Sequence, residues 1–101
     1  MEFGITTKER SMTITLRGEL DHHAARGTMQ EIERAVEAAL PLQLVLDFSG
    51  VTFMDSSGIA VVLRAQRRMQ TLGGAAELQG TPAQAKKVFE AAGIHRLISI
   101  R

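Results

Sequence analysis

The chain has 101 residues, a net charge of +1 and 45% hydrophobic residues, which are ordinary values for one globular domain. Cysteine is absent, which excludes disulfide bonds, a cysteine nucleophile and cysteine-ligated zinc. The small net charge and the four aromatic residues, all Phe, give no argument for nucleic-acid binding. No apolar run approaches the roughly 18 residues of a membrane span, and the N-terminus lacks the regions of a signal peptide. We therefore expect a single cytoplasmic domain over residues 1–101, with no membrane and no direct nucleic-acid partner.

The first half of the chain predicts a hairpin, a long helix and a central strand. Phe3–Thr7 and Met12–Arg17 alternate apolar and polar residues on either side of a polar turn, which predicts a β-hairpin. Apolar residues then recur at helical spacing from His22 to Ala39, and Pro41 ends that helix. Leu42–Phe48 is a short apolar run, which is typical of a strand covered on both faces.

The middle of the chain predicts a helix that begins with hydroxyl side chains. Asp55 and Ser56 are candidate N-caps, helical spacing starts at Ile59, and Gly73-Gly74 is a helix-ending signal. Ser56 and Ser57 would then be exposed at the positive end of a helix dipole, where a phosphate is well tolerated. The simpler alternative is that the two serines only cap the helix.

The last third predicts one more strand, a helix and a final strand. Ala75–Gln79 is the strand, and Thr81-Pro82-Ala83-Gln84 is a helix start with a capping box between Thr81 and Gln84. Gly93 closes this helix, and Leu97–Ile100 forms the last strand. Alternating strands and helices imply an α/β fold. Its sheet would have about five mostly parallel strands, an N-terminal antiparallel hairpin and three or more helices.

Two segments carry a resemblance to a known family. Residues 18–23, GELDHH, and residues 53–58, FMDSSG, together resemble the STAS family, the domain shared by sulphate transporters and anti-sigma factor antagonists. The closest resemblance is to antagonists of the sporulation type, also called anti-anti-sigma factors, and it covers essentially the whole chain. Family members usually continue past the last strand into another helix. This chain stops at Arg101, so we expect either that the sequence is truncated or that the domain is unusually short, which would leave Ile98 and Ile100 less covered.

The resemblance implies a mechanism called partner switching, in which the domain is a substrate and not an enzyme. The unphosphorylated form binds an anti-sigma factor serine kinase and so releases a sigma factor. The kinase then phosphorylates the first hydroxyl of the turn, which is Ser56 here, and a serine phosphatase restores binding. A phosphate beside Asp55 and Asp21 should weaken kinase binding through like-charge repulsion and desolvation. No cofactor is implied.

The predicted docking surface combines the start of the first helix, the Ser56 turn and the outward side of the following helix. Its residues are Asp21, His22, His23, Asp55, Ser57, Gly58, Ala60, Val61, Arg64 and Arg68. Arg64 and Arg68 would meet an acidic partner, although a solvated face that also includes Arg67 is the simpler interpretation. His22 and His23 lie beside Asp21, but no third ligand is evident, so we expect no metal site.

Two other classes of function stay open. One is a STAS subunit of a lipid transporter or a regulatory domain of an anion transporter, a class that often lacks the full Asp-Ser-Ser-Gly turn. The other is an enzyme acting through Ser56, which would need a base that no histidine obviously supplies.

Overall fold

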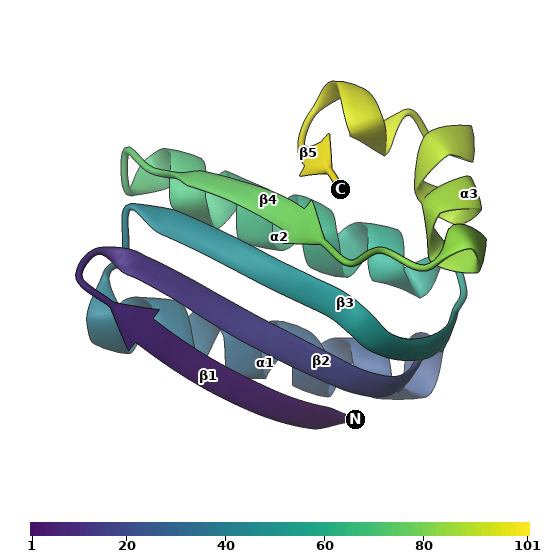
Figure 1. The fold of residues 1–101 in the computed structure, drawn as a ribbon, viewed down its shortest axis with the longest axis horizontal. Helices are drawn as coiled ribbons and strands as arrows, with labels where there is room; N and C mark the ends of the chain where they lie inside the picture. The colour runs from purple at the N-terminus through teal and green to yellow at the C-terminus, as the bar shows by residue number, and fades with distance from the viewer.

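A five-stranded sheet organises the molecule, and the structure, a computed structural model, describes all of residues 1–101 (Figure 1). In chain order the elements are β1 (Glu2–Lys8), β2 (Ser11–Leu20), α1 (His22–Ala39), β3 (Gln43–Met54), α2 (Ser57–Thr71), β4 (Ala75–Gln79), α3 (Ala83–Ala91), a 3₁₀ turn (Ile94–Arg96) and β5 (Ser99–Ile100). The strand order is β1-β2-β3-β4-β5, with β1 antiparallel to β2 and all other pairs parallel. The predicted fold class is therefore confirmed. No helix combines the length and the apolar character that a membrane crossing requires.

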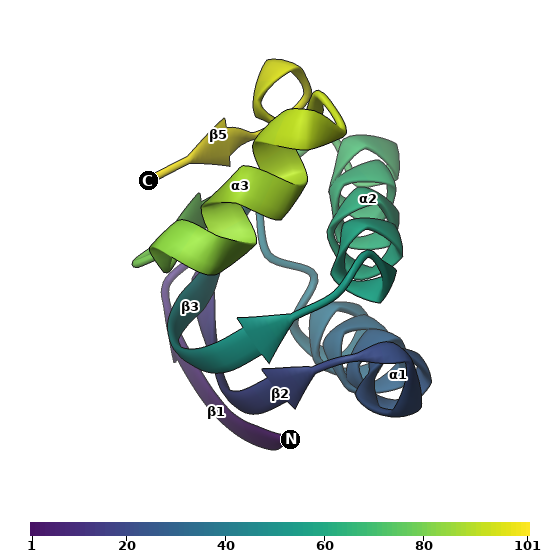
Figure 2. The ribbon, with the colours of Figure 1, turned by 90° about the vertical axis from the view of Figure 1, so that its right-hand side faces the viewer.

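The helices are distributed unevenly around the sheet. Helices α1 and α2 pack against each other on one face, and α3 lies at the end of the sheet where β3 bends (Figures 1 and 2). The prediction that the central strand is covered on both faces is confirmed only in part. Leu44, Leu46 and Phe48 are fully buried on the helix side. On the opposite face Val45 is buried, whereas Gln43 and Asp47 are partly exposed.

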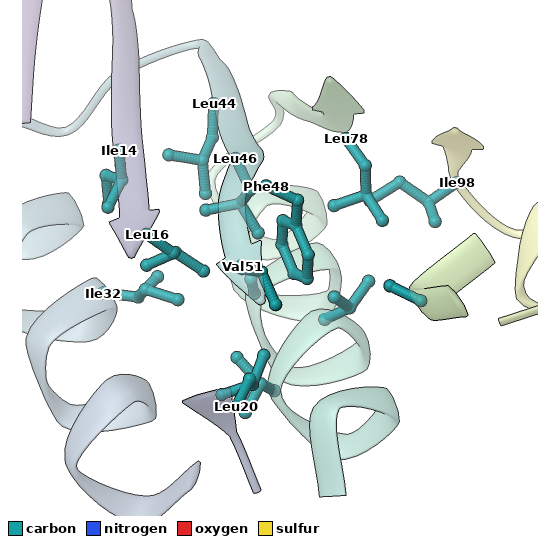
Figure 3. Packing of buried hydrophobic residues seen from close by; sticks show 14 of the residues in the cluster. Ile14, Leu16, Leu20, Ile32, Leu44, Leu46, Phe48, Val51, Leu78 and Ile98 are labelled. Atoms are coloured by element: carbon teal, nitrogen blue, oxygen red, sulfur yellow. The ribbon is translucent and has the colours of Figure 1, made fainter. Parts of the chain in front are cut away.

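The core fills the space between the sheet and the helices, and it draws on every layer (Figure 3). Phe48 of β3 meets Phe89 of α3 edge to face, with ring centroids 5.7 Å apart, which joins α3 to the sheet. The labelled core residues in Figure 3 are Ile14, Leu16, Leu20, Ile32, Leu44, Leu46, Phe48, Val51, Leu78 and Ile98. This packing holds the ends of β2 and β3 firmly in place.

Strands β2 and β3 run further than predicted, and this changes the place of both motif segments. We expected β2 to end at Arg17 and β3 to end at Phe48, but they continue to Leu20 and Met54. The pairing register shifts between Gly18 and Glu19, and Gly18 adopts a φ of 116°, which only glycine takes readily. The irregularity bends the pair without ending it, so the motif residues lie at the ends of strands.

The start of α3 also differs from the prediction, since the capping box does not form. Pro82 is the N-cap residue and no side chain caps the helix. The Thr81 hydroxyl is buried without a hydrogen-bond partner, and the Thr81 amide donates to the Arg101 carbonyl at 3.0 Å. Gln84 points away from Thr81 and binds the end of β3. Long-range contacts have replaced the local cap.

The C-terminal segment forms a shorter strand than expected. Gly93, with a φ of 74°, begins the 3₁₀ turn, so only Ser99 and Ile100 remain as β5. Ile98 is only 5% exposed, and the expectation that it would be poorly covered is wrong. Ile100 is partly buried against the core. By contrast, the predicted bounds of α1 are confirmed at both ends.

Candidate functional site

Two helix N-termini meet at one edge of the sheet. Strands β2 and β3 are parallel neighbours, with Leu20 paired to Met54, so both carboxyl ends lie at the same edge. Each strand leads directly into a helix, β2 into α1 and β3 into α2 (Figure 2). The Asp55 amide donates to the Leu20 carbonyl at 3.3 Å. The two motif segments, far apart in sequence, therefore lie side by side.

The carboxylate of Asp55 connects the starts of both helices. Its Oδ1 accepts from the Ser57 amide at 2.8 Å, and its Oδ2 accepts from the His22 amide at 3.2 Å. The hydrogen bond from the Ser57 amide is the main reason that the pKa of Asp55 lies below its ordinary value, while desolvation opposes the shift. Asp55 is therefore ionised at neutral pH, and it places one fixed negative charge beside Ser56.

Asp21 is the N-cap of α1. Its Oδ1 accepts from the amides of His23 and Ala24, both at 3.0 Å. These bonds satisfy two amides at the positive end of the helix, and a carboxylate there is also favoured by the helix dipole. Asp21 is partly buried and both bonds are to backbone amides, so it fixes the start of α1 beside the Ser56 turn.

The two serines of the turn occupy different environments. Ser56 occupies the predicted N-cap position of α2, but it is exposed and its side chain makes no capping hydrogen bond. Asp55 performs that role through the amide of Ser57, which is itself partly buried. The amides of Gly58 and Ile59 donate to the carbonyls of Asp55 and Ser56, both at 3.1 Å. The Ser56 hydroxyl is therefore free, while the amides near it are already occupied.

Gly58 and Val61 support the turn from beneath. Gly58 is buried, and a Cβ there would collide with the Met54 side chain and lie 3.3 Å from Leu20 Cδ2. Val61 is 1% exposed and belongs to the core, so neither residue presents a side chain to a partner. Ala60 is exposed. Of these three predicted contact residues, only Ala60 lies on the surface.

Arg64 and Arg68 connect α2 to α1. Arg64 pairs with Glu33, and Arg68 Nη2 lies 3.3 Å from Glu37 Oε1. Arg67 is exposed and forms no ion pair. A shallow groove between the two helices is lined by Met29, Ala60, Leu63, Arg64 and Arg67. Arg64 and Arg67, but not Arg68, thus border a groove that begins at Ala60, close to the Ser56 turn.

His22 and His23 are exposed at the start of α1, with their ring centroids 4.1 Å apart. No group of three His, Cys, Asp or Glu side chains lies together where a metal ion could be held. The His22 amide is bound by Asp55, so this histidine backbone belongs to the same hydrogen-bonded unit as the Ser56 turn.

Two residues at the site were missed by the sequence reasoning. Phe53 is 45% exposed next to the turn, although a large aromatic side chain is usually buried. The alternation of strand side chains could have indicated this, because Met54 points inward and its neighbour must point outward. Gln84 of α3 binds the backbone of Met54, and no local pattern predicts that contact.

Comparison with known proteins agrees with this geometry. A family model described as the STAS domain matches residues 3–101. The anti-sigma F factor antagonist of Lysinibacillus sphaericus is 32% identical over 90 residues, which is 89% of this chain and 76% of that protein. The anti-sigma factor antagonist SpoIIAA in its unphosphorylated form is 29% identical with a TM-score of 0.83, covering 99% of this chain and 88% of SpoIIAA. Phosphorylated SpoIIAA, described as a Bacillus cell fate determinant, is 29% identical with a TM-score of 0.74, covering 99% and 91%.

The match therefore extends over the sheet, all three helices and both segments that form the site. The fold, the order of its elements and the Asp-Ser-Ser-Gly turn point to one assignment: this chain belongs to the STAS domain family.

Proposed function

We propose that this protein is an anti-sigma factor antagonist that acts in the cytoplasm by partner switching. The observation that carries the proposal is the free, exposed Ser56 hydroxyl, in a turn at the end of β3 that the Asp55 carboxylate fixes through the amide of Ser57. Its relative SpoIIAA has been solved in unphosphorylated and phosphorylated forms, which supports a regulatory phosphorylation in this family. The unphosphorylated protein binds an anti-sigma factor and thereby frees a sigma factor.

The anti-sigma factor is a serine kinase in this proposal, and Ser56 is its substrate. The domain performs no chemistry of its own, and a serine phosphatase removes the phosphate. Phosphorylation adds about −1.5 to −2 charge units next to the Asp55 carboxylate. Because the amides of Ser57, Gly58 and Ile59 are already bonded, they cannot neutralise this charge without breaking existing bonds. The phosphate therefore remains exposed and repels a partner surface that fits the unmodified turn.

An affinity loss of about a hundredfold, which corresponds to ~3 kcal/mol, is sufficient for such a switch. Local charge and bulk provide this loss directly at the docking surface. No rearrangement of the sheet or the helices is needed.

The docking surface of the proposal is centred on Ser56. It includes the exposed residues on both sides of the turn, and its border follows the groove between α1 and α2. The contacting residues are Asp21, His22, His23, Asp55, Ser57, Ala60, Arg64 and Arg68, with Phe53 added as an apolar anchor. Arg64 and Arg68 can serve an acidic partner only by sharing or exchanging their present partners Glu33 and Glu37.

Phosphorylation by the cognate kinase tests this function. The purified protein is incubated with the kinase and ATP, and peptide mass spectrometry locates the phosphate. We expect one phosphate on Ser56, none on the Ser56→Ala variant, and normal modification of the matched Ser57→Ala variant. A phosphate found only on Ser57, or none on the unaltered protein, would refute the proposed role of Ser56.

A further inference from the structure

The last residues of β3 lack a neighbouring strand on one side. β4 pairs with β3 only from Gln43 to Asp47, whereas β3 continues to Met54 along β2. Backbone groups that point toward the β4 side at Met54 would therefore have no strand partner. A buried strand end with unpaired amide and carbonyl groups is costly, so another group must satisfy them.

The side chain of Gln84 fills this place. Its Oε1 accepts from the Met54 amide at 2.9 Å, and its Nε2 donates to the Met54 carbonyl at 2.7 Å. One primary amide thus supplies both a donor and an acceptor to a single residue, as a neighbouring strand would. Met54 lies two residues before Ser56, so this contact joins α3 to the start of the Ser56 turn.

The geometry points to Gln84 as a positioning residue for the phosphorylation of Ser56, an inference that rests on the proposed function. Three contacts fix the turn: the Asp55 amide to Leu20, the Asp55 carboxylate to Ser57 and His22, and the Gln84 amide to Met54. The first two hold the turn to β2 and to the helix starts, and only Gln84 holds it from the α3 side. Reaction rates depend steeply on the alignment of the attacking group, so a loosened Met54 should slow transfer to the Ser56 hydroxyl.

The substitution Gln84→Glu tests the inference, because it replaces only the side-chain NH2 group of Gln84 with an oxygen. An ionised glutamate can still accept from the Met54 amide, but it cannot donate to the Met54 carbonyl and repels it. A protonated glutamate could do both, but position 84 is exposed, so a glutamate there is ionised at the pH of a kinase assay. Gln84→Ala removes the contact at every pH. Gln70→Glu is the charge-matched control, because Gln70 is exposed at the far end of α2 and forms no side-chain hydrogen bond.

The experiment measures kcat and KM for phosphorylation by the cognate kinase at pH 8.0, each variant relative to the unaltered protein. At pH 8.0 we expect kcat to fall by about tenfold for Gln84→Glu and Gln84→Ala, the order expected for a misaligned reacting group, and to stay unchanged for Gln70→Glu. A fall confined to kcat, with KM unchanged, is the result expected of a positioning residue. Amide hydrogen exchange at Met54 should accelerate in Gln84→Ala, which leaves that amide without its acceptor.

The outcomes separate this inference from the function on which it rests. Faster exchange at Met54 with an unchanged kcat would show that Gln84 is only structural, and this result would overturn the inference alone. A kcat lowered equally by Gln70→Glu, or a change in KM alone, would also overturn it. If the unaltered protein receives no phosphate on Ser56, the proposed function and the inference both fail.

Discussion

Substitutions at Ser56 should separate the contribution of charge from that of bulk, because the Ser56 side chain makes no hydrogen bond in the structure. Removing an N-cap hydroxyl ordinarily costs ~1–2 kcal/mol. Here the cap is Asp55, so Ser56→Ala should change the free energy of unfolding by no more than about 0.5 kcal/mol, the usual range for a surface site. The alanine variant should therefore fold and bind the kinase as the unaltered protein does, while resisting phosphorylation.

The aspartate variant should lie between the unmodified and phosphorylated forms. It adds one negative charge beside Asp55 where phosphate adds nearly two, with fewer oxygens. If phosphate costs ~3 kcal/mol of kinase binding, Ser56→Asp should cost about half, or roughly a tenfold loss of affinity.

Isothermal titration against the kinase should rank the forms in a defined order. The unmodified protein and Ser56→Ala bind best, Ser56→Asp binds less well, and the phosphoprotein binds worst. Urea unfolding of the same samples controls for stability. Equal affinity of the phosphorylated and unmodified forms would refute partner switching at Ser56.

Substitutions at four further residues test the architecture around the turn. Asp21→Ala should lower the free energy of unfolding by ~1–2 kcal/mol in urea, whereas Asp21→Asn keeps a capping oxygen and should cost much less; equal losses would contradict the capping role. Gly58→Ala should cost ~1–3 kcal/mol by overpacking against Met54, and an unchanged urea midpoint would show that the helix adjusts freely. Phe53→Ala should weaken kinase binding by ~1–3 kcal/mol without loss of stability, and unchanged affinity would exclude it as an anchor. Folding lowers the pKa of Asp55 below its ordinary value of 3.8. The ionised Asp55 carboxylate therefore stabilises the fold fully above pH 3.8, and this contribution is lost as the pH falls through the pKa of the folded state. The free energies of unfolding of the unaltered protein and of Asp55→Asn should converge in acid, and a difference that stays constant with pH would contradict this linkage.

The fold was largely predictable from the sequence, because periodicity and capping residues act locally. The bounds of α1 follow from its apolar spacing and from its N-cap Asp21. The position of Ser56 at the start of α2 follows from the Asp-Ser-Ser-Gly sequence before the next apolar helix. Strand ends were less predictable, since the irregularity at Gly18 lets β2 and β3 continue beyond their apolar runs.

Contacts between distant residues were not predictable from one sequence. Gln84 has the spacing of a capping-box residue, yet the unpaired Met54 backbone binds it more favourably than Thr81 does. Likewise, nothing in the spacing of Arg64 and Arg68 indicates that their partners lie on α1. Such competition between local and tertiary partners is decided only in the folded chain.

The two ion pairs between α1 and α2 have a consequence for how the helix layer keeps its alignment. Glu33 and Glu37 are four residues apart, as are Arg64 and Arg68, so a slide of α2 by one turn would still match one arginine to a glutamate. Because a surface ion pair contributes only about 0–1 kcal/mol, losing one of the two pairs separates these alignments by little. The close approach at Gly58 has no such repeat, because no other residue of α2 lacks a side chain. High salt should consequently weaken the two ion pairs between α1 and α2, while the packing at Gly58 keeps the Ser56 turn in position.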